Sequence, residues 1–146
     1  MNSQIIFDTR NIKRYKFPTH INDLIIDRTQ ASCCEVFMVE VEPGKSVHHH
    51  KHDDAEQIFY IIKGAGILLT GKEKKEFHIK PGDVIRIPVS FYHSIRNEYE
   101  TTLAYLSIDC FGSKVPHEES WDDHVKVMCE TNGWDFEEVI SSCKAK

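Results

Sequence analysis

The stretch GKSVHHHKHDDAEQIFYIIKG, residues 44–64, places histidines, acidic residues and a run of strand-forming residues next to one another. His50 and His52 are two positions apart, so in an extended segment both imidazoles project to the same face. Two imidazoles on one face can bind a divalent ion, each at about 2.0–2.1 Å. Taken alone, the tract also fits a solvated polar loop. It lies inside the chain and leads into a strand, which argues against a purification tag.

Composition narrows the class of protein. The chain has 146 residues, 40% of them hydrophobic and 28% charged, which predicts one globular domain over residues 1–146. Its net charge of −5 gives no general attraction to nucleic acid, and its apolar runs are too short to span a membrane, so we expect neither as a partner. The five cysteines form no CxxC pair, and the N-terminus lacks the apolar core of a signal peptide. We therefore expect a reducing compartment, the cytoplasm.

Most of the chain has the pattern of strands. Short β-branched and aromatic runs alternate with glycine and proline, which favours an all-β sandwich or barrel. The runs occupy residues 34–44, 57–64, 65–83 (a hairpin), 83–90, 92–99 and 101–112.

The pattern changes near the C-terminus. Apolar residues there recur at helical spacing, at Trp121, Val125 and Met128. Ser120 is a candidate N-cap, Gly133 a candidate end, and Asp135 a candidate cap for a second, short helix. These signals predict a barrel core at about 35–110 and a helical tail at about 118–143.

A second motif follows the first. In residues 44–64, Gly44 is followed after five residues by His50-x-His52, then after four by Gln57 and after six by Gly64. In GDVIRIPVSFYHSIRN, residues 82–97, the anchors with the same kind of spacing are Gly82, Pro88, Ser90, His93 and Asn97.

This pair of motifs resembles those of the cupin superfamily, G-x5-H-x-H-x3–4-E-x6-G and G-x5-P-x-G-x2-H-x3-N. The match covers about residues 37–108, with two departures: Gln57 stands where the family usually has glutamate, and Ser90 replaces a glycine. The resemblance implies an all-β double-stranded β-helix, a jelly-roll-like barrel with a metal inside one mouth. It implies that His50, His52 and His93 bind one divalent transition metal, Mn, Fe, Ni or Zn.

The fourth ligand depends on the strand register. Glu56 and Gln57 are adjacent, so in a strand they point to opposite faces. Counting forward from His52 selects Glu56, whereas counting back from Gly64 selects Gln57. The loop at Asp53 can absorb an extra residue and the strand cannot. We therefore expect Gln57 to be the ligand, with Glu56 as the alternative.

Gln57 has a chemical consequence. Four neutral ligands leave a divalent ion its full charge, which favours polarisation of a carbonyl over oxygen activation. We expect a metal-dependent enzyme acting on a small polar molecule, such as a sugar or keto acid, by isomerase or lyase chemistry. An iron-dependent dioxygenase and a non-catalytic small-molecule-binding barrel are the alternatives, because a fold does not fix its chemistry.

Two further expectations concern the barrel walls. Phe59, Ile61 and Ile95 should line an apolar substrate pocket, while Arg86 should face outward. Open sheet edges, the N-terminal QIIF and the tail residues Trp121 and Trp134 suggest more apolar surface than a lone barrel needs, so we expect a homodimer.

Overall fold

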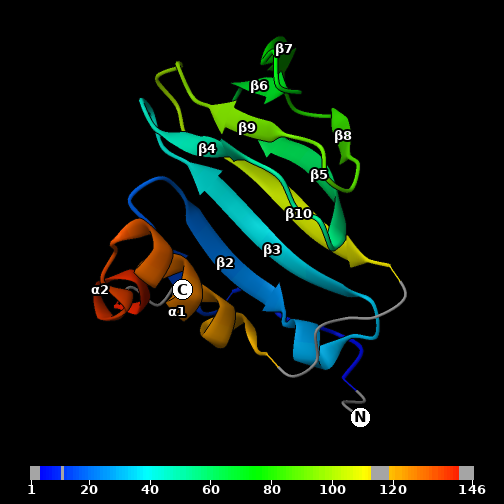
Figure 1. Ribbon diagram of the computed structural model, residues 1–146, viewed down its shortest axis with the longest axis vertical. Helices are drawn as coiled ribbons and strands as arrows, with labels where there is room; N and C mark the ends of the chain where they lie inside the picture. Colours follow the sequence, from blue (N-terminus) through cyan, green and yellow to red (C-terminus); the bar gives the residue numbers. More distant parts are fainter. Residues whose placement is uncertain (1–3, 11, 113–118, 142–146) are drawn as a thin grey trace.

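In the residues that the computed structural model describes, 4–10, 12–112 and 119–141, ten strands form two antiparallel sheets (Figure 1). The strands are β1 (Arg14–Lys16), β2 (Ile21–Ile26), β3 (Cys34–Val41), β4 (Ser46–His50), β5 (Ala55–Lys63), β6 (Gly66–Thr70), β7 (Lys75–Ile79), β8 (Val84–Ile87), β9 (His93–Arg96) and β10 (Leu103–Phe111). A short 3-10 helix, η1 (Arg28–Gln30), lies between β2 and β3.

The order of strands in the sheets is not their order in the chain. One sheet runs β1-β2-β3-β10-β5-β8 and the other β4-β9-β6-β7. The last strand, β10, therefore lies between β3 and β5, and β9 lies between β4 and β6. This arrangement confirms the predicted all-β barrel and places β4, which carries His50, beside β9, which carries His93, in one sheet.

Alternating burial along the central strands explains why they form a barrel wall. In β3 and β10 every second side chain is buried, as the period of two in a half-buried strand requires. The inward side chains form one apolar core, including Phe37, Val39, Val41, Leu103 and Tyr105. Removing this apolar surface from water is the main force that holds the two sheets together.

Sequence patterning missed β1 and β2, so the six-stranded sheet begins well before the predicted core at 35. Polar Asn22 and Asp23 interrupt the apolar pattern of β2, although both are buried. The burial of Asp23 is possible because Arg14, its partner across the β1–β2 register, donates to its carboxylate at 2.7 and 2.9 Å. A buried ion pair has no signature in hydrophobic periodicity.

The predicted helices are present, as α1 (Trp121–Asn132) and α2 (Phe136–Ile140), while both ends of the predicted tail lie outside the described residues. Ser120 caps α1, Gly133 ends it at a φ of 71°, and Asp135 caps α2. Neither described helix is long and apolar enough to cross a membrane. The described cysteines are free thiols, and Cys143 lies outside the described part.

The helices pack against the β1–β3 end of the six-stranded sheet rather than projecting from the barrel (Figure 1). The Trp121 indole, 5% exposed, contacts Phe37 at a ring-centroid distance of 4.5 Å, and Trp134 lies 5.6 Å from Phe17. The expectation that Trp121 adds free apolar surface is therefore wrong, because this chain already covers it, whereas Trp134 is partly buried. Ile5 and Ile6 of the N-terminal segment are exposed, at 89% and 85%.

At one motif glycine, Gly64, the backbone leaves no room for a Cβ atom. Gly64 follows β5 at a φ of +76°, and a Cβ there would lie 2.4 Å from the Thr102 carbonyl oxygen. Gly82 also has a positive φ, +95°, but a Cβ there would meet nothing within 4 Å. Only the first position therefore combines backbone strain with a clash.

We expect Gly64→Ala to destabilise the protein by about 2 kcal/mol or more beyond Gly82→Ala. The control should lose about 1–2 kcal/mol, the cost of a left-handed conformation for a residue with a Cβ. Urea unfolding followed by circular dichroism gives both values. Equal losses would mean that the β5–β6 turn yields freely and that the close approach to Thr102 has no energetic consequence.

Candidate metal site

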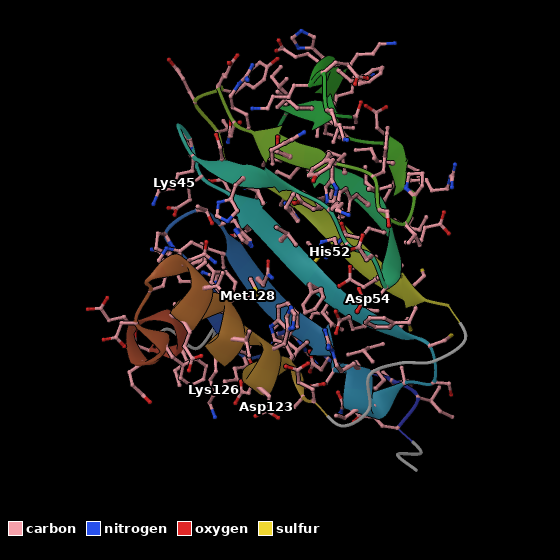
Figure 2. All side chains as sticks on the ribbon, viewed as in Figure 1. Lys45, His52, Asp54, Asp123, Lys126 and Met128 are labelled. Atoms are coloured by element: carbon pink, nitrogen blue, oxygen red, sulfur yellow. The ribbon has the colours of Figure 1, made fainter. Side chains whose placement is uncertain are left out.

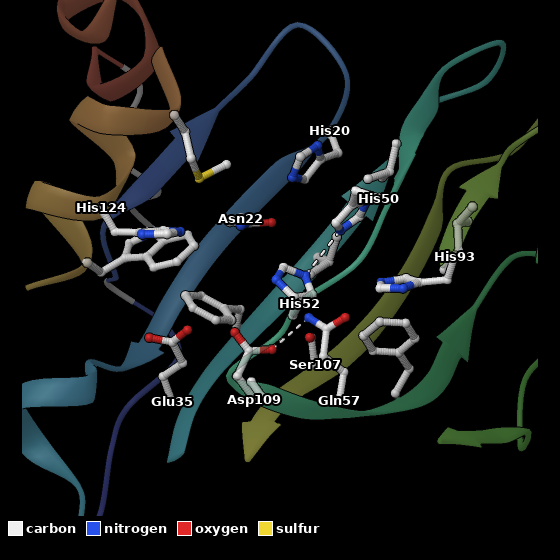
Figure 3. A pocket seen from close by; sticks show the side chains of 18 of the residues that line it. His20, Asn22, Glu35, His50, His52, Gln57, His93, Ser107, Asp109 and His124 are labelled. Atoms are coloured by element: carbon white, nitrogen blue, oxygen red, sulfur yellow. Dashed lines mark hydrogen bonds between the residues drawn. The ribbon is translucent and has the colours of Figure 1, made fainter. Parts of the chain in front are cut away.

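Three imidazoles meet inside the barrel. His50 ends β4 and lies opposite His93 of β9 in the register, while His52 follows in the loop before β5. One ligand nitrogen from each residue lies within 4.8 Å of the others, and His50 Nε2 is 3.1 Å from His52 Nε2. The structure thus brings together the three histidines that the motifs select (Figure 3).

Backbone carbonyls fix the orientation of two of these rings. His50 Nδ1 donates to the His48 carbonyl oxygen at 2.5 Å, and His93 Nδ1 donates to the Phe91 carbonyl oxygen at 3.0 Å. With Nδ1 protonated, the Nε2 lone pairs of both rings are available to an ion. A carbonyl partner on the far nitrogen is the usual support of a metal-binding histidine.

Burial keeps the three imidazoles neutral. It lowers the pKa of His50 to about 4 and that of His93 to about 3, and it lowers the pKa of His52 as well. A neutral imidazole has a lone pair to donate, whereas an imidazolium has none. The cluster is therefore in its metal-binding protonation state throughout the neutral pH range.

Gln57 and Glu56 face opposite ways. The Gln57 side chain lies between His52 and His93 (Figure 3), and its Nε2 donates to Asp109 Oδ1 at 2.7 Å. Glu56 instead accepts from Arg86 at 2.6 Å on the outside of the barrel, where the Arg86 side chain is 63% exposed. The structure thus places Gln57, and not Glu56, on the histidine side.

The free end of the Gln57 amide completes a donor set. Among the described residues, Gln57 Oε1 is a buried oxygen atom without a hydrogen-bond partner. An unpaired buried acceptor is costly unless something satisfies it. Three imidazole nitrogens and one amide oxygen suit a divalent transition ion such as Mn²⁺, Fe²⁺, Ni²⁺ or Zn²⁺, so the residues present fit such a group.

The motif serine also acts on this site. Ser90, where the family usually has glycine, has a φ of 62°, in the left-handed region. Its backbone N–H donates to the His52 carbonyl oxygen at 2.7 Å, and its hydroxyl donates to Asp53 at 2.8 Å. Ser90 therefore ties down the loop that carries His52, despite the strain at its own backbone.

The histidines open into a cavity of about 270 Å³, near the lower end of the ~300–1,000 Å³ typical of small-molecule sites. Phe59 and Ile95 line it as predicted. Ile61 does not: the prediction for it is wrong, because its fully buried side chain belongs to the apolar core and is absent from the cavity lining. The tail supplies the opposite wall, with Trp121, His124, Met128 and Trp134.

One wall of the cavity is polar, and the sequence did not predict it. Glu35 of β3 and Asp109 of β10 are direct cross-strand partners, both buried, and both line the cavity beside Gln57 (Figure 3). Arg28 of η1 donates to Glu35 at 2.7 and 3.2 Å. The alternation of β3 could have revealed Glu35, which shares its face with Phe37 and Val39.

Comparison with known proteins agrees with this geometry. A model of the family described as the cupin domain matches residues 37–109. An oxalate-binding protein of Thermotoga maritima is 36% identical over 70 residues, which are 48% of this chain and 56% of that protein. The chain spans 13% to 61% of the length of the first curated relatives it matches.

Solved structures share the fold. A predicted oxalate decarboxylase of Thermotoga maritima superposes with a TM-score of 0.66 at 22% identity, over 74% of this chain and 100% of that one. A Klebsiella pneumoniae protein with a double-stranded β-helix domain gives 0.64 at 18% identity, over 77% and 94%. At such identities the likeness shows the fold alone.

The lowered pKa values predict that metal binding resists acid. Protons compete with an ion for the imidazoles, and His50 and His93, with pKa values of about 4 and about 3, offer little competition at pH 6. We expect the Mn²⁺ dissociation constant to rise less than about fourfold from pH 7.5 to 6.0, whereas three ordinary imidazoles would raise it about fiftyfold. Electron paramagnetic resonance of free Mn²⁺ measures it, and release should follow near pH 4. A steep loss by pH 6 would contradict the burial argument.

Proposed function

The chain belongs to the cupin domain family, and we propose that it is a metal-dependent enzyme acting on a small oxygen-bearing molecule. The observation that carries the proposal is the buried, unpaired Oε1 of Gln57 beside three neutral imidazoles, at the wall of a cavity. A structural metal is usually enclosed by protein ligands, whereas a catalytic one keeps positions open toward a cavity. His50, His52, His93 and Gln57 would hold the ion.

The donor set bears on the type of reaction. A divalent ion between four neutral donors supplies Lewis acidity toward a carbonyl or an anionic oxygen. Because Gln57 contributes no negative charge to this set, we favour isomerase or lyase chemistry over iron-dependent oxygenation. The oxalate-binding relative supports a small, oxygen-rich ligand in general terms.

The remaining wall residues have roles that follow from their contacts. Asp109 accepts from Gln57 Nε2 and so directs Oε1 toward the histidines. Phe59 and Tyr105, whose rings lie 5.0 Å apart, make the adjoining surface apolar, which limits water around a bound molecule. The Glu35 carboxyl lies in the same cavity, as the ion-pair partner of Arg28, which donates to it at 2.7 Å.

Substitution of single ligands tests the proposal. We expect His93→Ala to reduce bound metal at least tenfold and to abolish turnover without unfolding the barrel, because the apolar core does not rest on the ion. Gln57→Glu should retain metal and change reactivity, with oxygen uptake if the protein is loaded with iron. His78→Ala is the matched control, since His78 lies on β7, outside the cavity lining, and bonds Tyr99. Metal content is measured by elemental analysis.

Activity is measured on a panel of sugars, keto acids and thiols, with oxygen uptake recorded in parallel. Turnover that is equal with and without a chelator would refute the metal-dependent mechanism. Oxygen consumption by the wild-type protein with one substrate would favour the dioxygenase alternative. Tight binding of a panel compound without conversion would favour a non-catalytic binding protein.

We also propose that the protein forms a homodimer. The β5–β8 side of the six-stranded sheet exposes Tyr60, Ile62 and Val84, at 47%, 47% and 66%, and Tyr60 and Val84 are cross-strand partners. The strand β8 ends this sheet and so leaves one edge unpaired among the described strands. We expect sedimentation velocity at micromolar concentration to give a dimer, and Val84→Lys to shift it toward monomer. A wild-type monomer would exclude the assembly.

A further inference from the structure

The cavity has two chemically different ends. One is the neutral histidine cluster with Gln57, and the other is the polar wall of Glu35 and Asp109, which faces α1 (Figure 3). Figure 2 shows His52 and Asp54 on the strand side of this space and Met128 on the helix side. A molecule held at the histidines would therefore extend toward Glu35 and α1.

Negative charge is in surplus at this second end. Glu35, Asp54 and Asp109 line the cavity, and the Arg28 guanidinium is already engaged by Glu35 at 2.7 Å and Glu119 at 3.7 Å. Burial, and after it the neighbouring Asp109, raise the pKa of Glu35, whereas the Arg28 guanidinium lowers it.

Imidazoles do not offset this surplus. Burial lowers the pKa of His20 to about 3, and it also lowers the pKa of His124, so these two histidines of the wall are neutral at pH 7. A carboxylate or phosphate of a ligand at this end would face acceptors of its own sign without a free cation in the lining described here. The free-energy cost of removing that anionic group from water would therefore not be offset by a new interaction.

Two buried polar atoms of described cavity-lining residues lack a hydrogen-bond partner. Among the described residues, Asn22 Oδ1 is a buried acceptor and Trp121 Nε1 a buried donor, each without a hydrogen bond. Their side chains belong to residues that are 7% and 5% exposed. A ligand hydroxyl can donate to the first and accept from the second, whereas a carboxylate can only accept and an ammonium can only donate.

We propose that the cavity binds an uncharged, hydroxyl-bearing small molecule, with an oxygen function at the histidines and a hydroxyl end against Asn22, Glu35 and Trp121. Dicarboxylates and phosphorylated compounds are rejected at the hydroxyl end. The inference rests on the proposed function, because the ion held by the histidines anchors the opposite end.

Three probes with one metal-binding head and different tails test this selectivity. Butyrohydroxamate ends in a methyl group, γ-hydroxybutyrohydroxamate in a hydroxyl, and succinate monohydroxamate in a carboxylate. Calorimetric titration of the full, Zn²⁺-loaded chain with each probe gives its dissociation constant. We expect the hydroxyl probe to bind about tenfold more tightly than the methyl probe and the carboxylate probe about tenfold more weakly, each a shift of about 1.4 kcal/mol.

Single substitutions test which residue causes the rejection of the carboxylate probe and which causes the preference for the hydroxyl probe. Glu35→Gln should bring the carboxylate probe to within about threefold of the methyl probe, whereas Glu56→Gln, the same change on the outer face, should leave all three constants unchanged. Asn22→Ala should remove the hydroxyl preference and keep the carboxylate penalty. Thermal unfolding verifies that each variant is folded. The comparison of the three probes on the wild-type chain does not depend on any variant.

The outcomes separate this inference from the proposed function. A carboxylate probe that binds as tightly as the hydroxyl probe, or affinities that do not depend on the tail, would overturn the inference alone. Failure of the methyl probe to bind the Zn²⁺-loaded chain, with no uptake of Zn²⁺ by the protein, would overturn the metal site and the inference with it.

Discussion

The pairing of β10 with β3 on one side and β5 on the other is the constraint on which the site depends. It places Glu35, Asp109 and Gln57 in one row across three strands, all on the inner face. Side chains alternate along each strand, so a slip of β5 by one residue would turn Gln57 outward and bring Glu56 inward. An apolar neighbour on the same face, Phe59, makes that slip costly because it would leave the core.

That same alternation explains how far the sequence could predict the structure. The sequence predicts three kinds of feature because each depends on local geometry. They are the strands with a regular apolar period, the histidine spacings, and the caps of α1 and α2. The choice of Gln57 over Glu56 as the inward residue followed from the length of a single strand. The strand β2 was missed because Asn22 and Asp23 look like loop residues until Arg14 is placed beside them. Ile61 was misplaced because its alternation shows an inward side chain and cannot tell a cavity wall from the packed core.

The pairing of Glu35 with Asp109 in the polar wall could not be predicted, for a related reason. Glu35 and Asp109 are 74 positions apart in numbering, and only the β3–β10 register makes them neighbours. Their burial works against stability: a buried ion pair such as Arg28–Glu35 returns little net free energy, and loss of one partner costs about 3–5 kcal/mol. Polar groups kept in a core at such a cost are more readily understood as parts of a binding site than as supports of the fold.

The division of the chain into matched and unmatched parts has a consequence for the cavity. The stretch shared with the family, residues 37–109, contains the three histidines and Gln57. Three residues of the cavity wall lie outside it: Arg28 in η1, Glu35 on β3 just before the matched stretch begins, and Trp121 of α1 after β10. The shared half holds the candidate metal ligands, while residues of the flanking segments line the rest of the cavity. Substitutions in the segments that flank the shared stretch would therefore alter the cavity lining without any change to the candidate metal ligands.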